Sequence, residues 1–185
     1  MIGVHFRSGG AGPFLDIPVS ELVDTHVPLR YAADPGAAIL RERLMVGGSP
    51  EARLDVLERW LMQRLLRRRH RDQAIAWAVR MIERRPNVRM HDIAARIGRS
   101  SRWFIDRFAS EVGLTPKTFS RVRRFQAAVG LMHARSGIDF ADLALSLGYA
   151  DQAHFSHEFR AIGGITPTAY LAGRTAHPNH VAVAD

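Results

Sequence analysis

The stretch LALSLGYADQAHFSHEFRAIGGITPTAY, residues 143–170, decides the fold. A short apolar segment with the small Ala144 at its centre ends at Gly148, a residue suited to a turn. Phe155 and Phe159 then recur four positions apart, which marks one face of a second, longer helix. Two helices joined by a short glycine-containing turn form a helix-turn-helix, so the stretch predicts this motif.

A second copy of the pattern lies 50 residues earlier, and the offset becomes 51 after one residue is inserted in the turn. The matched positions are Ile93, Ala94, Ile97, Gly98, Phe104, Phe108, Gly113, Thr115, Pro116 and Phe119 in the first copy, and Leu143, Ala144, Leu147, Gly148, Phe155, Phe159, Gly164, Thr166, Pro167 and Tyr170 in the second. An internal repeat of this kind predicts two equivalent structural units.

Burial of the paired phenylalanines leaves the first turn and the opposite face of each second helix in solvent. In DNA-binding proteins this second helix enters the major groove and its first residues reach base edges. A two-helix repeat is also an ordinary packing motif, but two copies in a basic chain favour DNA. The apolar stripe of Phe119, Val122, Phe125, Val129 and Met132 predicts that helix 116–134 connects the copies.

Residues 72–172 resemble the DNA-binding domain of AraC/XylS-type bacterial transcription regulators. The resemblance is carried by Ala144, Gly148, Tyr149, Asp151, Gln152, His154, Phe155, Ser156, Phe159, Arg160, Gly164, Thr166, Pro167 and Tyr170. It implies an all-α domain of seven helices with two helix-turn-helix units, whose second helices enter successive major grooves on one face of the duplex.

The resemblance also implies which residues read bases. They are Ser101, Arg102, Ile105 and Asp106 in the first unit, and Gln152, Ala153, Ser156 and His157 in the second. Arg102 can donate to guanine O6 and N7, and Gln152 can bond adenine N6 and N7. Asp106 can accept from a cytosine amine or hold Arg102 at i, i+4. Ile105 and Ala153 can contact a thymine methyl group.

Phosphate contacts are less specific, because any arginine near the groove rim will serve. The candidates are Arg99, Arg107, Arg123, Arg124 and Arg160. The sequence departs from the family pattern at His157–Glu158, where a basic residue is common. We therefore expect weaker DNA binding by the second unit, with a pH-dependent part if His157 faces a phosphate.

Glycine and proline breaks divide the region after residue 71 into seven expected helices. Their spans are 72–84, 90–97, 101–112, 116–134, 139–147, 151–161 and 167–172. The tail, 173–185, has no periodicity and is expected to be disordered.

Residues 1–36 contain many glycines and prolines, with runs such as 2–6 and 27–29 that read as brief strands or extended pieces. Residues 3–24 look similar to the last strand and exit segment of the N-terminal sensor domain of one group of these regulators. Most of that domain is absent from the chain, as in a natural short form, in a fragment, or after a gene start placed too far downstream. A small-molecule effector pocket and sensor-mediated dimerisation are therefore doubtful.

Residues 37–71 have helical periodicity and form the expected helical linker. Ser49 and Pro50 are typical of an N-cap and first turn. The basic cluster Arg64, Arg67, Arg68, Arg69 and Arg71 favours a solvated helix end, with a phosphate-facing linker as the alternative.

The composition is that of a globular chain of 185 residues, with 46% hydrophobic residues and a net charge of +8. This charge favours an anionic partner, and the resemblance makes that partner double-stranded DNA. There are no cysteines, no secretion signal and no apolar run near the ~18 residues of a membrane span, so we expect a cytoplasmic protein.

No sequence feature predicts an enzyme, a cofactor or a metal site. His154 and His157 share a helix face but have no third ligand at suitable spacing. The predicted function is sequence-specific transcription regulation, by a monomer or weak homodimer with RNA polymerase as a further partner. The alternative is a helical interaction module, or a truncated antagonist that pairs with a full-length regulator.

Overall fold

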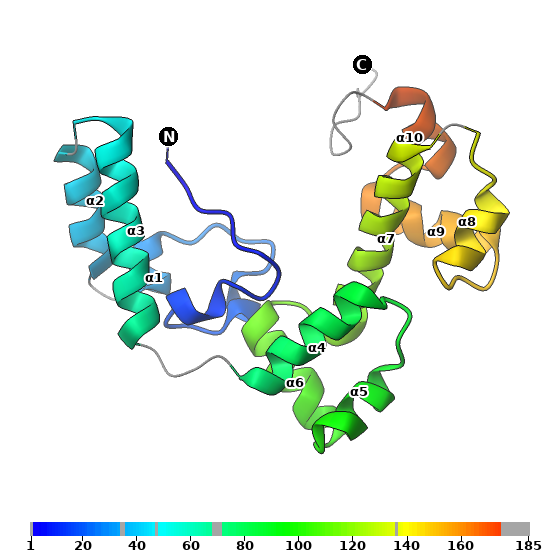
Figure 1. Ribbon diagram of the computed structural model, residues 1–185, viewed down its shortest axis with the longest axis horizontal. Helices are drawn as coiled ribbons and strands as arrows, with labels where there is room; N and C mark the ends of the chain where they lie inside the picture. The colour runs from blue at the N-terminus through cyan, green and yellow to red at the C-terminus, as the bar shows by residue number, and fades with distance from the viewer. Residues whose placement is uncertain (1, 34–35, 47, 68–71, 136, 175–185) are drawn as a thin grey trace. The chain divides into compact units, whose positions relative to one another are not determined.

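The computed structural model describes residues 2–33, 36–46, 48–67, 72–135 and 137–174. This part of the chain is helical and contains no β-sheet (Figure 1), which confirms the all-α prediction. Its elements are the 3-10 helices η1 (Gly12–Phe14) and η2 (Val19–Leu22), and the α-helices α1 (Leu29–Ala32), α2 (Gly36–Val46), α3 (Pro50–Arg67), α4 (Gln73–Arg84), α5 (Met90–Ile97), α6 (Ser101–Val112), α7 (Pro116–Ala134), α8 (Phe140–Ser146), α9 (Gln152–Gly163) and α10 (Pro167–Gly173).

The seven helices predicted after residue 71 are present as α4 to α10. The bounds of α5, α6 and α7 are those predicted, and the bounds of the other four differ by two residues or fewer. The 19-residue α7 is the long helix expected between the two repeats. By its internal contacts the chain forms two units, Met1–Arg80 with Met90–Pro116, and Met81–Arg89 with Lys117–Asp185.

The N-terminal runs predicted as brief strands or extended pieces form no strand. Residues 2–6 have no regular secondary structure, and Leu29 begins the single helical turn α1. Pro13 in η1 and the prolines that precede η2 and α1 each allow one tight turn. The resemblance of this segment to part of a sensor domain stays a prediction.

In the first unit, α3 begins as predicted, with the Ala52 amide donating to Ser49 Oγ at 3.2 Å. The prediction that Arg64 lies on a solvated basic face is wrong, because the residue is buried. Its Nη2 lies 2.7 Å from Asp16 Oδ2, and its Nε donates to the Phe14 carbonyl at 2.8 Å. Residues 68–71 of the basic cluster, and the tail from residue 175, lie outside the described residues.

The N-terminal segment also packs against α6 in this unit. A Cβ placed on Gly12 would lie 3.3 Å from the Glu111 carbonyl oxygen, and one on Gly113 would lie 3.0 Å from Val19 Cγ1. The segment from η1 to η2 therefore contacts α3 through Arg64 and the C-terminal end of α6 through Gly12 and Val19.

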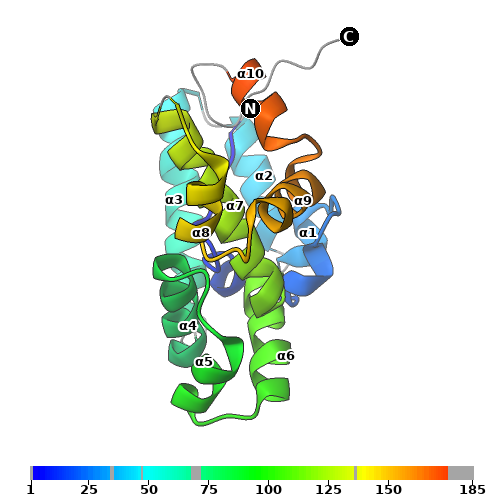
Figure 2. The same cartoon turned by 90° about the vertical axis from the view of Figure 1, so that its right-hand side faces the viewer.

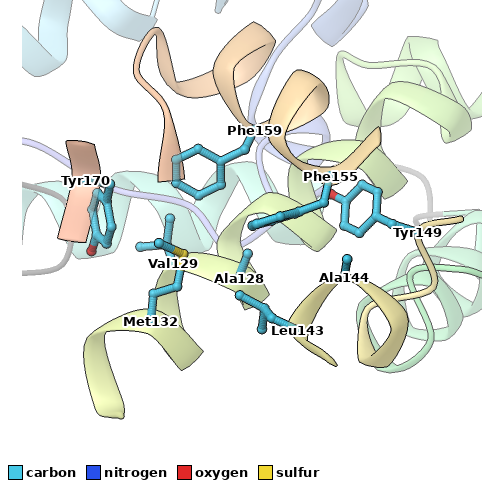
Figure 3. Close-up of a cluster of buried hydrophobic side chains, with 9 residues drawn as sticks. All are labelled: Ala128, Val129, Met132, Leu143, Ala144, Tyr149, Phe155, Phe159 and Tyr170. Atoms are coloured by element: carbon cyan, nitrogen blue, oxygen red, sulfur yellow. The ribbon is translucent and has the colours of Figure 1, made fainter. Parts of the chain in front are cut away.

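The core of the second unit is a cluster of nine buried residues from α7, α8, α9 and α10 and the turn before α9 (Figure 3). They are Ala128, Val129, Met132, Leu143, Ala144, Tyr149, Phe155, Phe159 and Tyr170. Phe159 is central to the aromatic part, with ring centroids 5.7 Å from Phe155 and 5.9 Å from Tyr170. Beyond α10, Arg174 Nη1 donates to the Met132 carbonyl at 2.8 Å and so caps the end of α7.

We expect Phe159→Ala to lower the free energy of unfolding by about 3–5 kcal/mol, because truncation removes buried area and leaves a cavity. Urea denaturation followed by circular dichroism measures this change. Leu145→Ala is the matched control, since Leu145 is exposed on α8 and its truncation is expected to cost less than about 0.5 kcal/mol. Equal losses in the two variants would contradict the assigned core.

Candidate nucleic-acid interface

The turn between α5 and α6 sets the start of α6 (Figure 2). Gly98 has a left-handed backbone with φ of +72°, which glycine adopts without strain. The Arg99 amide donates to the Ala94 carbonyl at 3.2 Å and closes the turn. Ser100 then caps α6, because its Oγ accepts from the Trp103 amide at 3.2 Å.

The rotation of α6 about its axis is set by Phe104 and Phe108. Both side chains are fully buried and meet edge to face, with ring centroids 5.6 Å apart. The predicted base-reading residues of this unit are exposed on the other side of the helix: Ser101, Arg102, Ile105 and Asp106. All four side chains are therefore accessible to a ligand.

Arg102 and Asp106 form the i, i+4 pair that the sequence left open. Arg102 Nε lies 3.9 Å from Asp106 Oδ2, and the two side chains are 94% and 71% exposed. A pair this long and this exposed contributes well under about 1 kcal/mol. Arg102 is therefore free to exchange Asp106 for another acceptor at little cost.

The turn between α8 and α9 repeats this arrangement in the second unit. Gly148 has φ of +76°, and a Cβ there would lie 2.8 Å from Asn87 Cβ, so only glycine fits. Asp151 caps α9 by accepting from the His154 amide at 2.7 Å. The same two features, a left-handed glycine and a polar cap, thus begin both second helices.

Phe155 and Phe159 are buried and fix the rotation of α9 as the equivalent pair does for α6. The predicted base-reading residues on α9 again lie away from the core. Gln152, Ala153 and His157 are exposed, and Ser156 is half-buried.

Glu158, one of the two residues at which the sequence departs from the family pattern, does not lie on the exposed face of α9. It is buried, with a side chain 9% exposed, and it accepts from Arg124 Nη2 at 2.8 Å and Arg121 Nε at 3.1 Å. The two arginines are on α7, so this ion-pair cluster ties α9 to α7. The Glu158 charge is therefore neutralised inside the unit, and the weaker DNA binding expected for the second unit stays a prediction.

Tyr149 covers one side of this cluster. The Arg124 guanidinium carbon lies 4.4 Å from the centre of the Tyr149 ring, which is a cation–π contact. Burial raises the pKa of the Tyr149 hydroxyl, and the nearby Glu158 carboxylate raises this pKa further. The hydroxyl therefore stays protonated at any physiological pH.

The five phosphate candidates differ in how free their side chains are. Arg99 and Arg160 are exposed, and Arg99 lies over the Trp103 ring at 5.3 Å. Arg107 is paired with Glu111 at 2.7 Å and with Asp72 at 3.3 Å. Arg123 donates to Gln126 Oε1 at 2.7 Å, and Arg124 is 14% exposed and held by Glu158.

His154 packs at the turn, with its ring edge to face on Tyr149 at 5.3 Å. Its Nε2 lies 4.0 Å from Glu158 Oε2, and the exposed His157 is the next histidine on α9. Across the described residues, no group of three or more histidine, aspartate or glutamate side chains is arranged to hold a metal ion.

A family model described as a helix-turn-helix domain matches residues 93–173, which span the C-terminal part of α5 and all of α6 to α10. Residues 93–173 are thus similar to helix-turn-helix domains. The HTH-type transcriptional regulator YidL of Escherichia coli (strain K12) is 32% identical to this chain over 87 residues, which are 47% of this chain. The chain spans only 29% of the length of YidL.

Two solved structures share the fold of this helix-turn-helix domain. The C-terminal domain of AraT, a response regulator from Geobacillus stearothermophilus, is 18% identical to this chain, with a TM-score of 0.53. The alignment covers 57% of this chain and 89% of the AraT chain. A Chromobacterium violaceum transcriptional regulator described as having an AraC-type DNA-binding domain is 24% identical with a TM-score of 0.51, covering 56% of this chain and 94% of its own. These similarities show that the domain shares its fold with both structures.

The cluster of Arg121, Arg124, Glu158 and Tyr149 that joins α7 to α9 is not predicted by the sequence pattern. Arg124 belongs to this cluster, although its position in the sequence made it a phosphate candidate, and Arg121 is a partner that the pattern does not indicate. The available signal was the acidic residue next to the apolar Phe159, on a helix whose other buried positions are aromatic. A charged residue in such a place needs a partner.

None of the described helices combines the length and apolarity needed to cross a bilayer.

We expect Glu158→Gln to lower the free energy of unfolding by about 1–3 kcal/mol, because Arg121 and Arg124 lose their charged acceptor in a buried setting. Urea denaturation of the full chain measures this loss.

Asp106→Asn is the matched control for that variant. It removes one carboxylate charge from an exposed pair, and its expected effect is below about 0.5 kcal/mol. A Glu158→Gln protein as stable as Asp106→Asn would show that the buried cluster does not hold α9 in place.

Proposed function

We propose that this chain is a sequence-specific DNA-binding transcription regulator that inserts α6 and α9 into successive major grooves of promoter DNA. The observation that carries this proposal is the way in which each of these two helices packs within its own unit. Each has a buried phenylalanine pair on one side and exposed polar residues in its first turns on the other. This is the presentation that a recognition helix needs, because its N-terminal residues contact base edges.

Arg102 and Gln152 carry the strongest base contacts in this proposal. Arg102 donates two bonds to a guanine, and its exposed pair with Asp106 is weak enough to open or to share the arginine. Gln152 is the first residue of α9 and bonds an adenine. The secondary contacts are Ser101, Ile105, Asp106, Ala153, Ser156 and His157, with Ile105 and Ala153 placed against thymine methyl groups.

Arg99 and Arg160 are the proposed phosphate contacts, because both are exposed and neither forms an ion pair within the described residues. Arg107 and Arg123 can contribute after they leave Glu111, Asp72 or Gln126. Arg124 we assign to structure, since moving it would expose the buried Glu158 charge. The net charge of +8 also attracts the chain to the negatively charged duplex at distances longer than those of direct contacts.

The proposed setting is the cytoplasm, with double-stranded DNA and RNA polymerase as partners. The proposed active form is a monomer or weak homodimer, because one chain already carries two helices of the required kind. No catalytic role is proposed.

We expect Arg102→Ala and Gln152→Ala each to relax base preference in a different half of one asymmetric site. Each variant should lose about 1–3 kcal/mol of discrimination, the value of a bidentate base contact. Gel-shift titrations of the full chain on a bound promoter fragment and its single-base variants measure this discrimination.

Arg160→Ala serves as the control, since loss of a phosphate contact should weaken binding to all sequences and reduce the log–log salt slope by about 1. If Arg102→Ala and Gln152→Ala each lost the same affinity for every DNA sequence, this result would refute their base-reading roles. No DNA affinity even at low salt would refute the function itself and favour a protein-interaction module.

A further inference from the structure

A pocket of about 510 Å³ lies between α2 and α3, away from the helix-turn-helix domain in sequence. Figure 1 shows these two helices side by side, and both belong to the first unit. The volume is within the range of about 300–1,000 Å³ that small-molecule sites occupy. One wall is apolar, formed by Ile39, Val56 and the indole of Trp60.

The rest of the lining is strongly basic. It includes Arg43, Arg59, Arg64 and Arg67, and it contains no acidic residue. Arg43, Arg59 and Arg67 are exposed, and no ion pair neutralises them within the described part of the chain. Four arginines therefore line this pocket, and within the described residues only Arg64 of the four has an acidic partner.

Arg64 gives this pocket a fixed wall. Asp16 and the Phe14 carbonyl hold its guanidinium, and the guanidinium carbon lies 5.1 Å from the centre of the Trp60 ring. Arg59 is partly ordered as well, because its Nε donates to the Asp55 carbonyl at 3.1 Å while its terminal nitrogens remain available. A preformed basic wall beside an indole lowers the ordering cost of binding a ligand.

We propose that this pocket binds a small organic anion, with a flat apolar body against Trp60 and a carboxylate or sulfonate held by the arginines. Planar guanidinium groups bond such groups through paired N–H donors, and an indole face accepts a flat ring. This site lies outside the base-reading helices and does not depend on the proposed DNA binding.

The test uses 1-anilinonaphthalene-8-sulfonate and its neutral analogue N-phenyl-1-naphthylamine as probes of the full chain. Fluorescence titration should give tighter binding of the sulfonate, and Arg43→Gln/Arg59→Gln should raise its Kd at least about tenfold, since two charge-assisted contacts are lost. The Kd of the neutral probe should change less than about twofold.

The matched control is Arg41→Gln/Arg53→Gln. It removes the same charge from the same two helices, but these arginines line a different pocket, and the sulfonate Kd should stay within about twofold of the parent. Far-ultraviolet circular dichroism checks that each variant keeps its helices.

Nuclear magnetic resonance of the unaltered chain locates the probe independently of these variants. The three tryptophans give three indole N–H signals, and the one that Trp60→Phe removes should shift on sulfonate addition. No sulfonate binding, equal response of both probes to Arg43→Gln/Arg59→Gln, or shifts confined to Trp77 and Trp103 would each overturn the proposal.

Discussion

Burial of two phenylalanines four residues apart holds each exposed second helix at one rotation about its axis. Phe104 and Phe108 do this for α6, and Phe155 and Phe159 do it for α9. In a helix of 3.6 residues per turn, fixing one face also fixes the direction of every other side chain. The exposure of Arg102 and Gln152 is therefore a consequence of where the phenylalanines pack, and the DNA-reading proposal depends on that burial.

The two repeats differ in the electrostatic contacts that support this packing. On α9, Glu158 is buried and joined to Arg121 and Arg124 of α7, so loss of its charge would leave arginines without a partner. On α6, Arg107 pairs with Asp72 and Glu111 in a more exposed setting, where ion pairs contribute less. Arginines that look equivalent in the sequence thus serve structure in one place and remain available to phosphates in another.

Local patterns were sufficient to predict α4 to α10, because apolar spacing, turn glycines and cap residues act within a few positions. The eight base-reading candidates came from the family resemblance; seven of them are exposed, and the eighth, Ser156, is half-buried. The pairs of Glu158 with α7 and of Arg64 with Asp16 could not be predicted, since their partners lie 34 to 48 residues apart in the sequence. Near the N-terminus, glycine and proline indicated breaks but did not distinguish extended chain from the single turns that form.

Selection of bound sequences from random double-stranded DNA by the full chain tests the central claim most directly. Two helices that read one duplex should enrich a single asymmetric site with two preferred blocks about one helical turn, or roughly 10 base pairs, apart. Enrichment of one block alone, or of no sequence at all, would contradict the two-helix account.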